Sequence, residues 1–162
     1  VYASIISSAT SYVHIMTPYF IVDREFFDSM RYAAQKGVEV SMILPHIPDK
    51  KAVYYIARTF YPQLLEAGIK VYEYTPGFVH AKIFTADDTT AVVGTVNLDY
   101  RSFYHHFECG VYFYENSVVE KVEEDFRKTL ESCQEVTMEY YKKIPIYQKM
   151  IGKIFKFFAP LM

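Results

Sequence analysis

The first half of the chain alternates short apolar runs with segments in which apolar residues recur every three or four positions. Runs rich in β-branched and aromatic residues predict buried strands at 12–16, 38–44 and 69–74. Helical spacing between a cap at Asp23 and Gly37, and again at 52–60, predicts two amphipathic helices. This alternation predicts an α/β fold, with a mixed, mainly parallel β-sheet flanked by helices on both faces.

The second half adds further strands and one more helix. Residues 79–85 and 90–93 are β-favouring runs separated by Ala-Asp-Asp-Thr, which predicts a hairpin. A further strand is expected at 109–114. Residues 117–132 carry regularly spaced apolar positions among many charges, which indicates a surface helix.

Length and composition indicate one domain. A chain of 162 residues that is 51% apolar can bury one core, so we expect a single domain over 1–162, with 136–162 as its C-terminal helical tail. A net charge of −2 provides no global positive field, which argues against a nucleic-acid partner. No run is long enough to predict a transmembrane segment in this chain. The first residue is Val1 rather than Met, so we interpret the chain as part of a longer protein.

Candidate chemistry lies in the middle of the chain. His80 and Lys82 are two positions apart on a predicted strand, so both side chains should project from the same face. Beyond them, Gly94 permits a tight turn and Asn97 can present amide donors. A phosphodiester gathers negative charge on its nonbridging oxygens during displacement, and an ammonium and an amide stabilise that charge. Imidazole, ammonium and amide together predict a phosphate site.

A histidine can catalyse such a displacement without any metal or other cofactor. It attacks phosphorus to give a phosphohistidine, while a second histidine protonates the departing alkoxide. The nucleophilic histidine needs a carboxylate on its other ring nitrogen, and Glu108 is the candidate for that orienting role. Glu108 could equally be an exposed strand residue. Asp87 stands beside the predicted hairpin turn, where a structural part suits it.

These residues resemble a known signature. His80, Lys82 and Asp87, in the pattern HxKxxxxD, resemble the HKD motif of the phospholipase D superfamily. The segment from Gly94 to Asp99 resembles that superfamily's GSxNxD pattern, with Thr95 where serine is usual and the hydroxyl kept. Nearly the whole chain is similar to the C-terminal half of bacterial cardiolipin synthases, in the stretches TPYF at 17–20, GVEV at 37–40, YEY at 72–74, GFVHAK at 77–82 and NLDYRSF at 97–103.

The resemblance implies a phospholipase D-like domain and assigns roles to its residues. It implies catalytic roles for His80, Lys82 and Asp87. It also implies phosphate binding by His80, Lys82, Thr95 and Asn97, and it strengthens the orienting role of Glu108. By the same analogy, His80 is the acid and base rather than the nucleophile. No metal ligand is implied. The last four residues, 159–162, also resemble the family's terminal motif, which suggests a natural C-terminus.

The implied reaction transfers a phosphatidyl group between two phosphatidylglycerol molecules, giving cardiolipin and glycerol through a phosphohistidine. Family members carry two HKD motifs after membrane-spanning helices, whereas this chain has one. The expected partners are therefore phosphatidylglycerol, a membrane surface, and either a missing N-terminal half or a homodimer mate. The expected location is the bacterial cell membrane, with the catalytic domain on the cytoplasmic side. Two alternatives are a phosphodiester hydrolase, which uses water as acceptor, and a fragment that is inactive alone.

Other polar residues have simpler structural interpretations. His14 is expected to be a satisfied core histidine and His46 an exposed loop residue. His105 and His106 are adjacent, so on a strand they would point to opposite faces and could not ligate one metal. Arg101 stays unassigned. Residues 17–19 end a strand where α/β sheets bind ligands, so they either line a pocket or simply terminate the strand.

The C-terminal segment 144–162 mixes Ile, Phe and Leu with Lys149, Lys153 and Lys156. That composition suits a helix lying at an anionic bilayer surface. A helix that docks on the missing half fits equally well, and the sequence does not separate the two.

Overall fold

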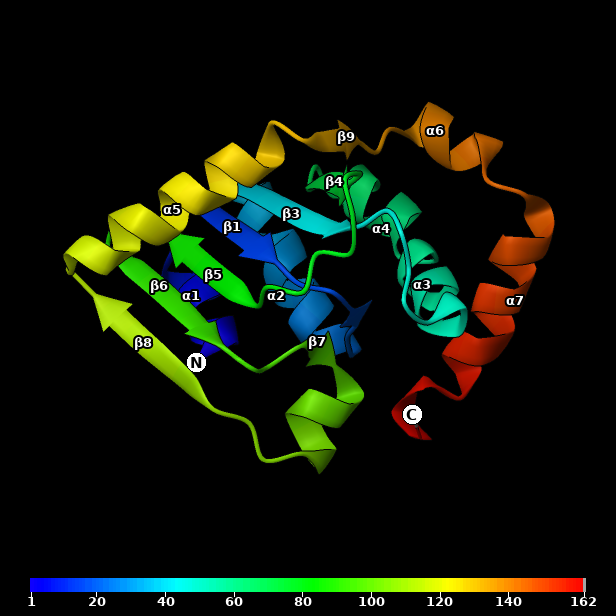
Figure 1. The fold of residues 1–162 in the computed structure, drawn as a ribbon, viewed down its shortest axis with the longest axis horizontal. Coiled ribbons are helices and arrows are strands. Elements are labelled where there is room, and N and C mark those ends of the chain that lie inside the picture. The colour runs from blue at the N-terminus through cyan, green and yellow to red at the C-terminus, as the bar shows by residue number, and fades with distance from the viewer. Residues whose placement is uncertain (162) are drawn as a thin grey trace.

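The computed structural model describes residues 1–161, which form a sheet with helices on both faces (Figure 1). The strands are β1 (Tyr12–Met16), β2 (Phe20–Ile21), β3 (Glu39–Pro45), β4 (Lys70–Tyr74), β5 (Ile83–Ala86), β6 (Thr90–Gly94), β7 (Leu98–Asp99), β8 (Gly110–Tyr114) and β9 (Cys133–Glu135). The α-helices are α1 (Tyr2–Ser8), α2 (Arg24–Gln35), α3 (Lys51–Arg58), α4 (Tyr61–Glu66), α5 (Ser117–Leu130), α6 (Met138–Lys143) and α7 (Ile146–Phe157). A π-helical turn, η1, spans Arg101–His105, and a 3-10 turn, η2, spans Ala159–Leu161.

The main sheet has seven strands in the order β8-β6-β5-β1-β3-β4-β9. Strand β3 pairs in parallel with both β1 and β4, and the other four pairings are antiparallel. The α/β class and the mixed sheet are confirmed. Parallel pairing is confined to the three strands joined by crossover helices, because β5 and β6 return as a hairpin. The sheet is thus less uniformly parallel than its first half suggests. A separate parallel pair, β2 and β7, joins the two segments that follow β1 and β6.

Helices cover both faces of the sheet, as predicted. Helix α5 lies across one face, and α1 and α2 lie behind the other (Figure 1). Alternate side chains of β1 enter the two layers, since Val13 and Ile15 belong to the larger core while Met16 packs with Phe126 of α5. The core therefore has one layer on each side of β1.

Several local signals are confirmed. The Asp23 carboxylate caps α2 by accepting from the Phe26 backbone N–H at 2.7 Å, and Gly37 follows the helix with φ of 92°. In the hairpin, Asp87 and Asp88 both have positive φ, 53° and 55°, as a type I′ turn requires. Strand register across the β5–β6 hairpin is therefore set by its turn.

Two predicted elements differ from the structure. The helix expected at 52–60 ends at Arg58 as α3, and α4 begins at Tyr61. The strand expected at 79–85 begins only at Ile83, because the pairing of β5 with β6 begins there, at Ile83 and Val93. His80 and Lys82 consequently lie in the extended segment that leads into β5.

The C-terminal segment continues from β9 into α6 and α7, and α7 packs along α3 (Figure 1). Of the predicted tail 136–162, Met162 lies outside the described residues. Among residues 1–161, no helix combines the length and the apolar character needed to cross a bilayer.

Candidate functional site

Two segments bring most of the candidate residues together at the start of β5. One leads into β5, and the other connects β6 to β8. They are joined because the Gly94 backbone N–H donates to the Lys82 carbonyl at 3.2 Å. Within the second segment, the Thr95 N–H donates to the Cys109 carbonyl at 2.8 Å, and the Cys109 N–H donates to Thr95 Oγ1 at 3.0 Å. Lys82, Thr95 and Glu108 therefore share one small region.

Gly94 is needed there for a close backbone approach. A Cβ at this position would lie 2.4 Å from the Cys109 carbonyl oxygen and 2.6 Å from the Gly110 Cα. Both neighbours are backbone atoms, so they could move only if β6 and β8 separated. The sequence predicted this glycine from turn geometry, but the physical reason is the tight β6–β8 contact.

The Glu108 carboxylate organises hydroxyl groups. Its Oε2 accepts from the Thr95 hydroxyl, and its Oε1 accepts from the Ser102 hydroxyl at 3.0 Å. His106 Nδ1 is 3.8 Å away from the same Oε1. The His80 ring is not among the hydrogen-bond partners found for this carboxylate within residues 1–161. Among the described residues, Glu108 holds the hydroxyl groups of Thr95 and Ser102, and the histidine beside it is His106.

Ser102 carries that orientation to Asn97. Because the Ser102 hydroxyl donates its proton to Glu108, its oxygen accepts from the Asn97 backbone N–H at 3.2 Å and from Asn97 Nδ2 at 3.3 Å. This assigns the amide orientation, which leaves Asn97 Oδ1 as a buried acceptor without a partner in the described part of the chain. Unsatisfied buried polar atoms are rare and mark sites that hold strain or bind a polar group. Sequence reasoning missed Ser102, which stands five residues after Asn97 with no local signal.

His80 and Lys82 lie beside this network. His80 is exposed, with its ring centroid 5.5 Å from that of Phe78. Lys82 is half-buried, and its Nζ donates to the His80 carbonyl at 2.7 Å. Burial lowers the pKa of Lys82, while the carboxylates of Glu108 and Asp99 act in the opposite direction without reversing the shift. A partly desolvated ammonium interacts more strongly with an anion than one in free water does.

Asp87 lies apart from these residues, at the opposite end of β5. Its carboxylate accepts from the backbone N–H groups of Thr10, Ser11 and Tyr12 at 2.7, 2.9 and 2.9 Å. Burial alone would raise the pKa of Asp87, but these hydrogen bonds outweigh it and lower the pKa. The carboxylate ties the β5–β6 hairpin to the start of β1, which supports the structural part and does not bring Asp87 to His80.

A cavity of ≈ 580 Å³ adjoins the site. Its lining includes Asn97 and Ser102 together with Tyr19, Arg101, His106 and Ala159. Tyr19 and Arg101, whose roles the sequence left open, are therefore both placed beside Asn97. Ala159 follows α7, so the C-terminal segment forms part of this wall.

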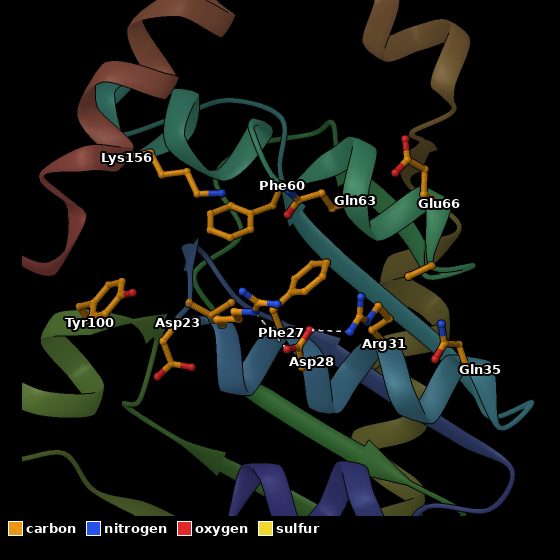
Figure 2. A pocket seen from close by; sticks show the side chains of 13 residues that line it. Asp23, Phe27, Asp28, Arg31, Gln35, Phe60, Gln63, Glu66, Tyr100 and Lys156 are labelled. Atoms are coloured by element: carbon orange, nitrogen blue, oxygen red, sulfur yellow. Dashed lines mark ion pairs between the residues drawn. The ribbon is translucent and has the colours of Figure 1, made fainter.

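A second cavity, of ≈ 640 Å³, lies between α2 and α4 and shares Tyr100 with the first (Figure 2). The ion pair between Asp28 and Arg31 runs along one wall, and the Lys156 amino group lies against the Phe60 ring. Mixed charges line this cavity, and neither His80 nor Lys82 is among its lining residues.

The other histidines belong to separate clusters. His14 is buried with its Nδ1 2.9 Å from Glu123, which confirms the core prediction. His46 is only half-exposed, because its Nδ1 lies 2.7 Å from the fully buried Glu73. The prediction of a simple exposed residue was wrong there. The signal was available, since Glu73 interrupts an apolar strand and a buried carboxylate needs partners. Within residues 1–161, no three His, Cys, Asp or Glu side chains are grouped to hold a metal ion.

Comparisons with known proteins place this geometry in context. A family model described as "Cardiolipin synthase, PLD-like domain" matches residues 2–130. An uncharacterized protein of Streptococcus mutans is 50% identical over 162 residues, which is all of this chain and 35% of that protein. A cardiolipin synthase of Clostridium perfringens is 40% identical over 99% of this chain and 34% of that protein. Cardiolipin synthase 2 of Bacillus cereus is 35% identical over 99% of this chain and 31% of that protein. The chain spans about a third of the length of these relatives.

Solved structures share the fold. Nuc of Salmonella typhimurium, a phospholipase D family member, superposes with a TM-score of 0.72 at 17% identity, covering 83% of this chain and 88% of that chain. A phosphatidylserine synthase of Haemophilus influenzae gives 0.73 at 18% identity, covering 98% of this chain and 41% of that chain. At these identities the likeness establishes the fold alone, and it confirms the phospholipase D-like domain.

Proposed function

The chain belongs to the cardiolipin synthase, PLD-like domain family, and we propose that it supplies one half-site for phosphatidyl transfer between two phosphatidylglycerol molecules, giving cardiolipin and glycerol. The observation that carries the proposal is that the Lys82 backbone is bonded to Gly94, three residues before Asn97, and that Asn97 is held by Ser102 and Glu108. The names of the relatives, several of them cardiolipin synthases, support a phospholipid substrate.

The charges of the site suit a phosphodiester. The Lys82 ammonium offers positive charge, and Asn97 Nδ2, which gives one hydrogen to Ser102, keeps a second hydrogen for a nonbridging oxygen. Both groups are preorganised because their supports are part of the fold. Glu108 is turned toward hydroxyl groups, so its negative charge is engaged away from an incoming phosphate.

The proposed reaction has two displacements. In the first, a histidine attacks phosphorus, the bond to glycerol breaks, and the glycerol oxygen takes a proton from the second histidine. In the second, the primary hydroxyl of another phosphatidylglycerol attacks the phosphohistidine and returns its proton to that second histidine. Cardiolipin leaves and the nucleophile is regenerated. We assign His80 to the acid and base role, because its ring has no carboxylate partner among the described residues.

The nucleophilic histidine then comes from elsewhere. Since the chain spans about a third of its relatives, we propose that the remaining polypeptide, or a second copy, supplies it with a second lysine and asparagine. The reaction is expected at the cytoplasmic face of the bacterial membrane.

The test is conversion of phosphatidylglycerol by the full-length protein in membranes, with cardiolipin, glycerol and phosphatidic acid measured separately. We expect His80→Ala to lose at least about 10²-fold in rate, the usual range for losing a general acid. His105→Ala is the matched control, because His105 is also exposed but stands outside the network.

Each product identifies an acceptor. Equal cardiolipin and glycerol that disappear in His80→Ala support the transferase. Phosphatidic acid would instead support a hydrolase, an alternative that the exposure of His80 to water keeps open. Absence of any product from the wild-type protein would contradict a catalytic function.

A further inference from the structure

Helix α7 packs against the domain through its small and polar side. Gly152 is buried against α3, and a Cβ there would lie 2.3 Å from the Tyr55 carbonyl oxygen and 2.8 Å from the Thr59 side chain. The two helix backbones are therefore in direct contact at this glycine. Any larger residue would push α7 away from α3.

Polar side chains on the same side of α7 fix the orientation of the helix about its own axis. Gln148 Oε1 accepts from Arg58 Nη1 at 3.3 Å, and Lys156 Nζ lies 3.4 Å from the Phe60 ring centroid (Figure 2). These two contacts lie two turns apart on the helix. Rotation of α7 to bury a different face would break both of them and expose Gly152.

The opposite side of α7 is apolar and faces outward. Ile146, Met150, Ile154 and Phe157 follow one another at helical spacing, and their exposed fractions are 71%, 58%, 60% and 81%. We call these four residues the α7 stripe. The helix is thus inverted relative to an ordinary surface helix, whose apolar side faces the core. A contiguous exposed apolar row of this kind marks an interaction surface.

Charge around the stripe identifies its partner. Residues 140–162 contain five lysines and no acidic residue, although the whole chain has a net charge of −2. Lys153 is exposed beside the stripe, and Lys142 is exposed just before α7. An apolar row flanked by lysines fits a lipid surface with anionic headgroups, because the lysine stems can lie along the apolar layer while their charges reach phosphate.

We propose that the α7 stripe lies on an anionic lipid surface, with its four apolar side chains at the acyl boundary and Lys142 and Lys153 among the phosphates. This surface would also serve the proposed function. Ala159, just beyond α7, lines the same cavity as Asn97, so docking through α7 would bring the site beside headgroups. Lipid docking itself does not depend on the site being catalytic.

The first experiment measures co-sedimentation of the 162-residue chain with vesicles of phosphatidylcholine alone or mixed with phosphatidylglycerol. We expect binding only to the mixed vesicles, and a loss of about tenfold or more in Met150→Glu/Ile154→Glu, which places two charges in the stripe. Tyr32→Glu/Ile47→Glu is the matched control, because both residues are exposed and lie on other elements. Lys153→Gln should weaken binding about fivefold.

Three results would overturn the proposal. The first is equal binding by wild type and the stripe variant, and the second is no binding by wild type. The third is a wild-type chain that dimerises without lipid while the stripe variant is monomeric, which would assign the stripe to a second copy. His80→Ala should bind vesicles like wild type, so failure of the proposed function would leave this result unchanged.

A second experiment uses the full-length protein, where other parts of the polypeptide could cover the stripe. The 162-residue chain has no tryptophan, so Ile154→Trp, in a full-length background whose other tryptophans are replaced, gives a single reporter. We expect brominated acyl chains to quench its fluorescence and to leave Tyr32→Trp unaffected. Blue-shifted emission at 154 without quenching would show that protein covers the stripe, and the proposal would fail.

Discussion

The two ends of β5 hold residues of one sequence motif, yet they differ in how their polar groups are used. At one end, the Asp87 carboxylate is satisfied by three backbone N–H groups and the Thr10 hydroxyl. At the other end, His80 is exposed, Lys82 is half-buried, and Asn97 Oδ1 is buried without a partner among the described residues.

The difference teaches how to separate structure from function within a motif. Polar groups that hold the fold are paired with other parts of the fold, because an unpaired buried group costs stability. Polar groups that bind a ligand keep hydrogen-bond donors or acceptors that the fold does not use. By this criterion Asp87 stabilises the hairpin, and ligand binding by His80, Lys82 and Asn97 is a prediction that rate measurements on their variants test.

The largest expected effect lies at the start of β5. Lys82→Ala should lower the rate by about 10²–10³-fold, the usual loss when one group that stabilises transition-state charge is removed. The melting temperature should stay close to wild type, since among the described residues the Nζ of Lys82 bonds only the His80 carbonyl. Lys121→Ala, an exposed lysine on α5, is the control.

The Lys82 ammonium also predicts a pH dependence. Because burial lowers the pKa of Lys82, the ammonium should be lost as the pH rises, before the pH reaches the ordinary lysine value of 10.5. Wild-type activity should fall over the same rise in pH.

The opposite end of β5 should respond in stability instead. Asp87→Asn removes the charge but keeps a residue type that tolerates positive φ, so we expect a loss of about 1–3 kcal/mol in the free energy of unfolding. Activity of the folded protein should stay within about twofold of wild type, since nothing in the transition state is removed. Asp88→Asn is the control. Among the described residues, the Asp88 carboxylate accepts from the Tyr12 hydroxyl and from no backbone N–H. Inactivity of Asp87→Asn at unchanged stability would restore the catalytic role that the motif resemblance implies.

Much of the fold follows from local pattern. Strand β1, the Asp23 cap and the Asp87–Asp88 turn are all marked by short-range signals that the structure retains. Helix α1 and the π-helical turn η1 were not predicted. The turn depends on Ser102, whose N–H bonds Asp99 and whose hydroxyl bonds Glu108. These contacts span only three and six residues, but neither follows the apolar periodicity from which the helices and strands were predicted.

The sequence predicted candidate site residues but not the contacts that connect them. The spacing of His80, Lys82 and Asn97 indicated a phosphate site, and the structure brings their segments together. Spacing alone could not show that Glu108 reaches Asn97 through Ser102. Nor could it show that Asp87 stands a full strand away from His80, because the motif records order along the chain and not distance.

A smaller effect is expected from the link between Glu108 and Asn97. Ser102→Ala removes the hydroxyl that accepts from Asn97, so the amide should lose its fixed orientation. We expect a decrease of about tenfold in kcat with little change in KM, as for an interaction made in the transition state. Ser29→Ala is the control, because its hydroxyl bonds only a carbonyl within α2. A kcat equal to wild type would show that Asn97 does not need Ser102.

The smallest expected effect is the pH dependence of the Asp87 contribution, and it tests why that end of β5 is stable. Hydrogen bonds lower the pKa of Asp87 in the folded protein below its ordinary value of 3.8. A carboxyl with a depressed folded pKa contributes stability above its unfolded pKa and loses that contribution as the pH falls through the folded pKa. The stability difference between wild type and Asp87→Asn, measured by urea unfolding, should therefore be constant from pH 7 to 5 and shrink below about 3.8. A difference that stays the same at pH 3 would mean that the geometry of the acceptor, and not its charge, anchors the hairpin to β1.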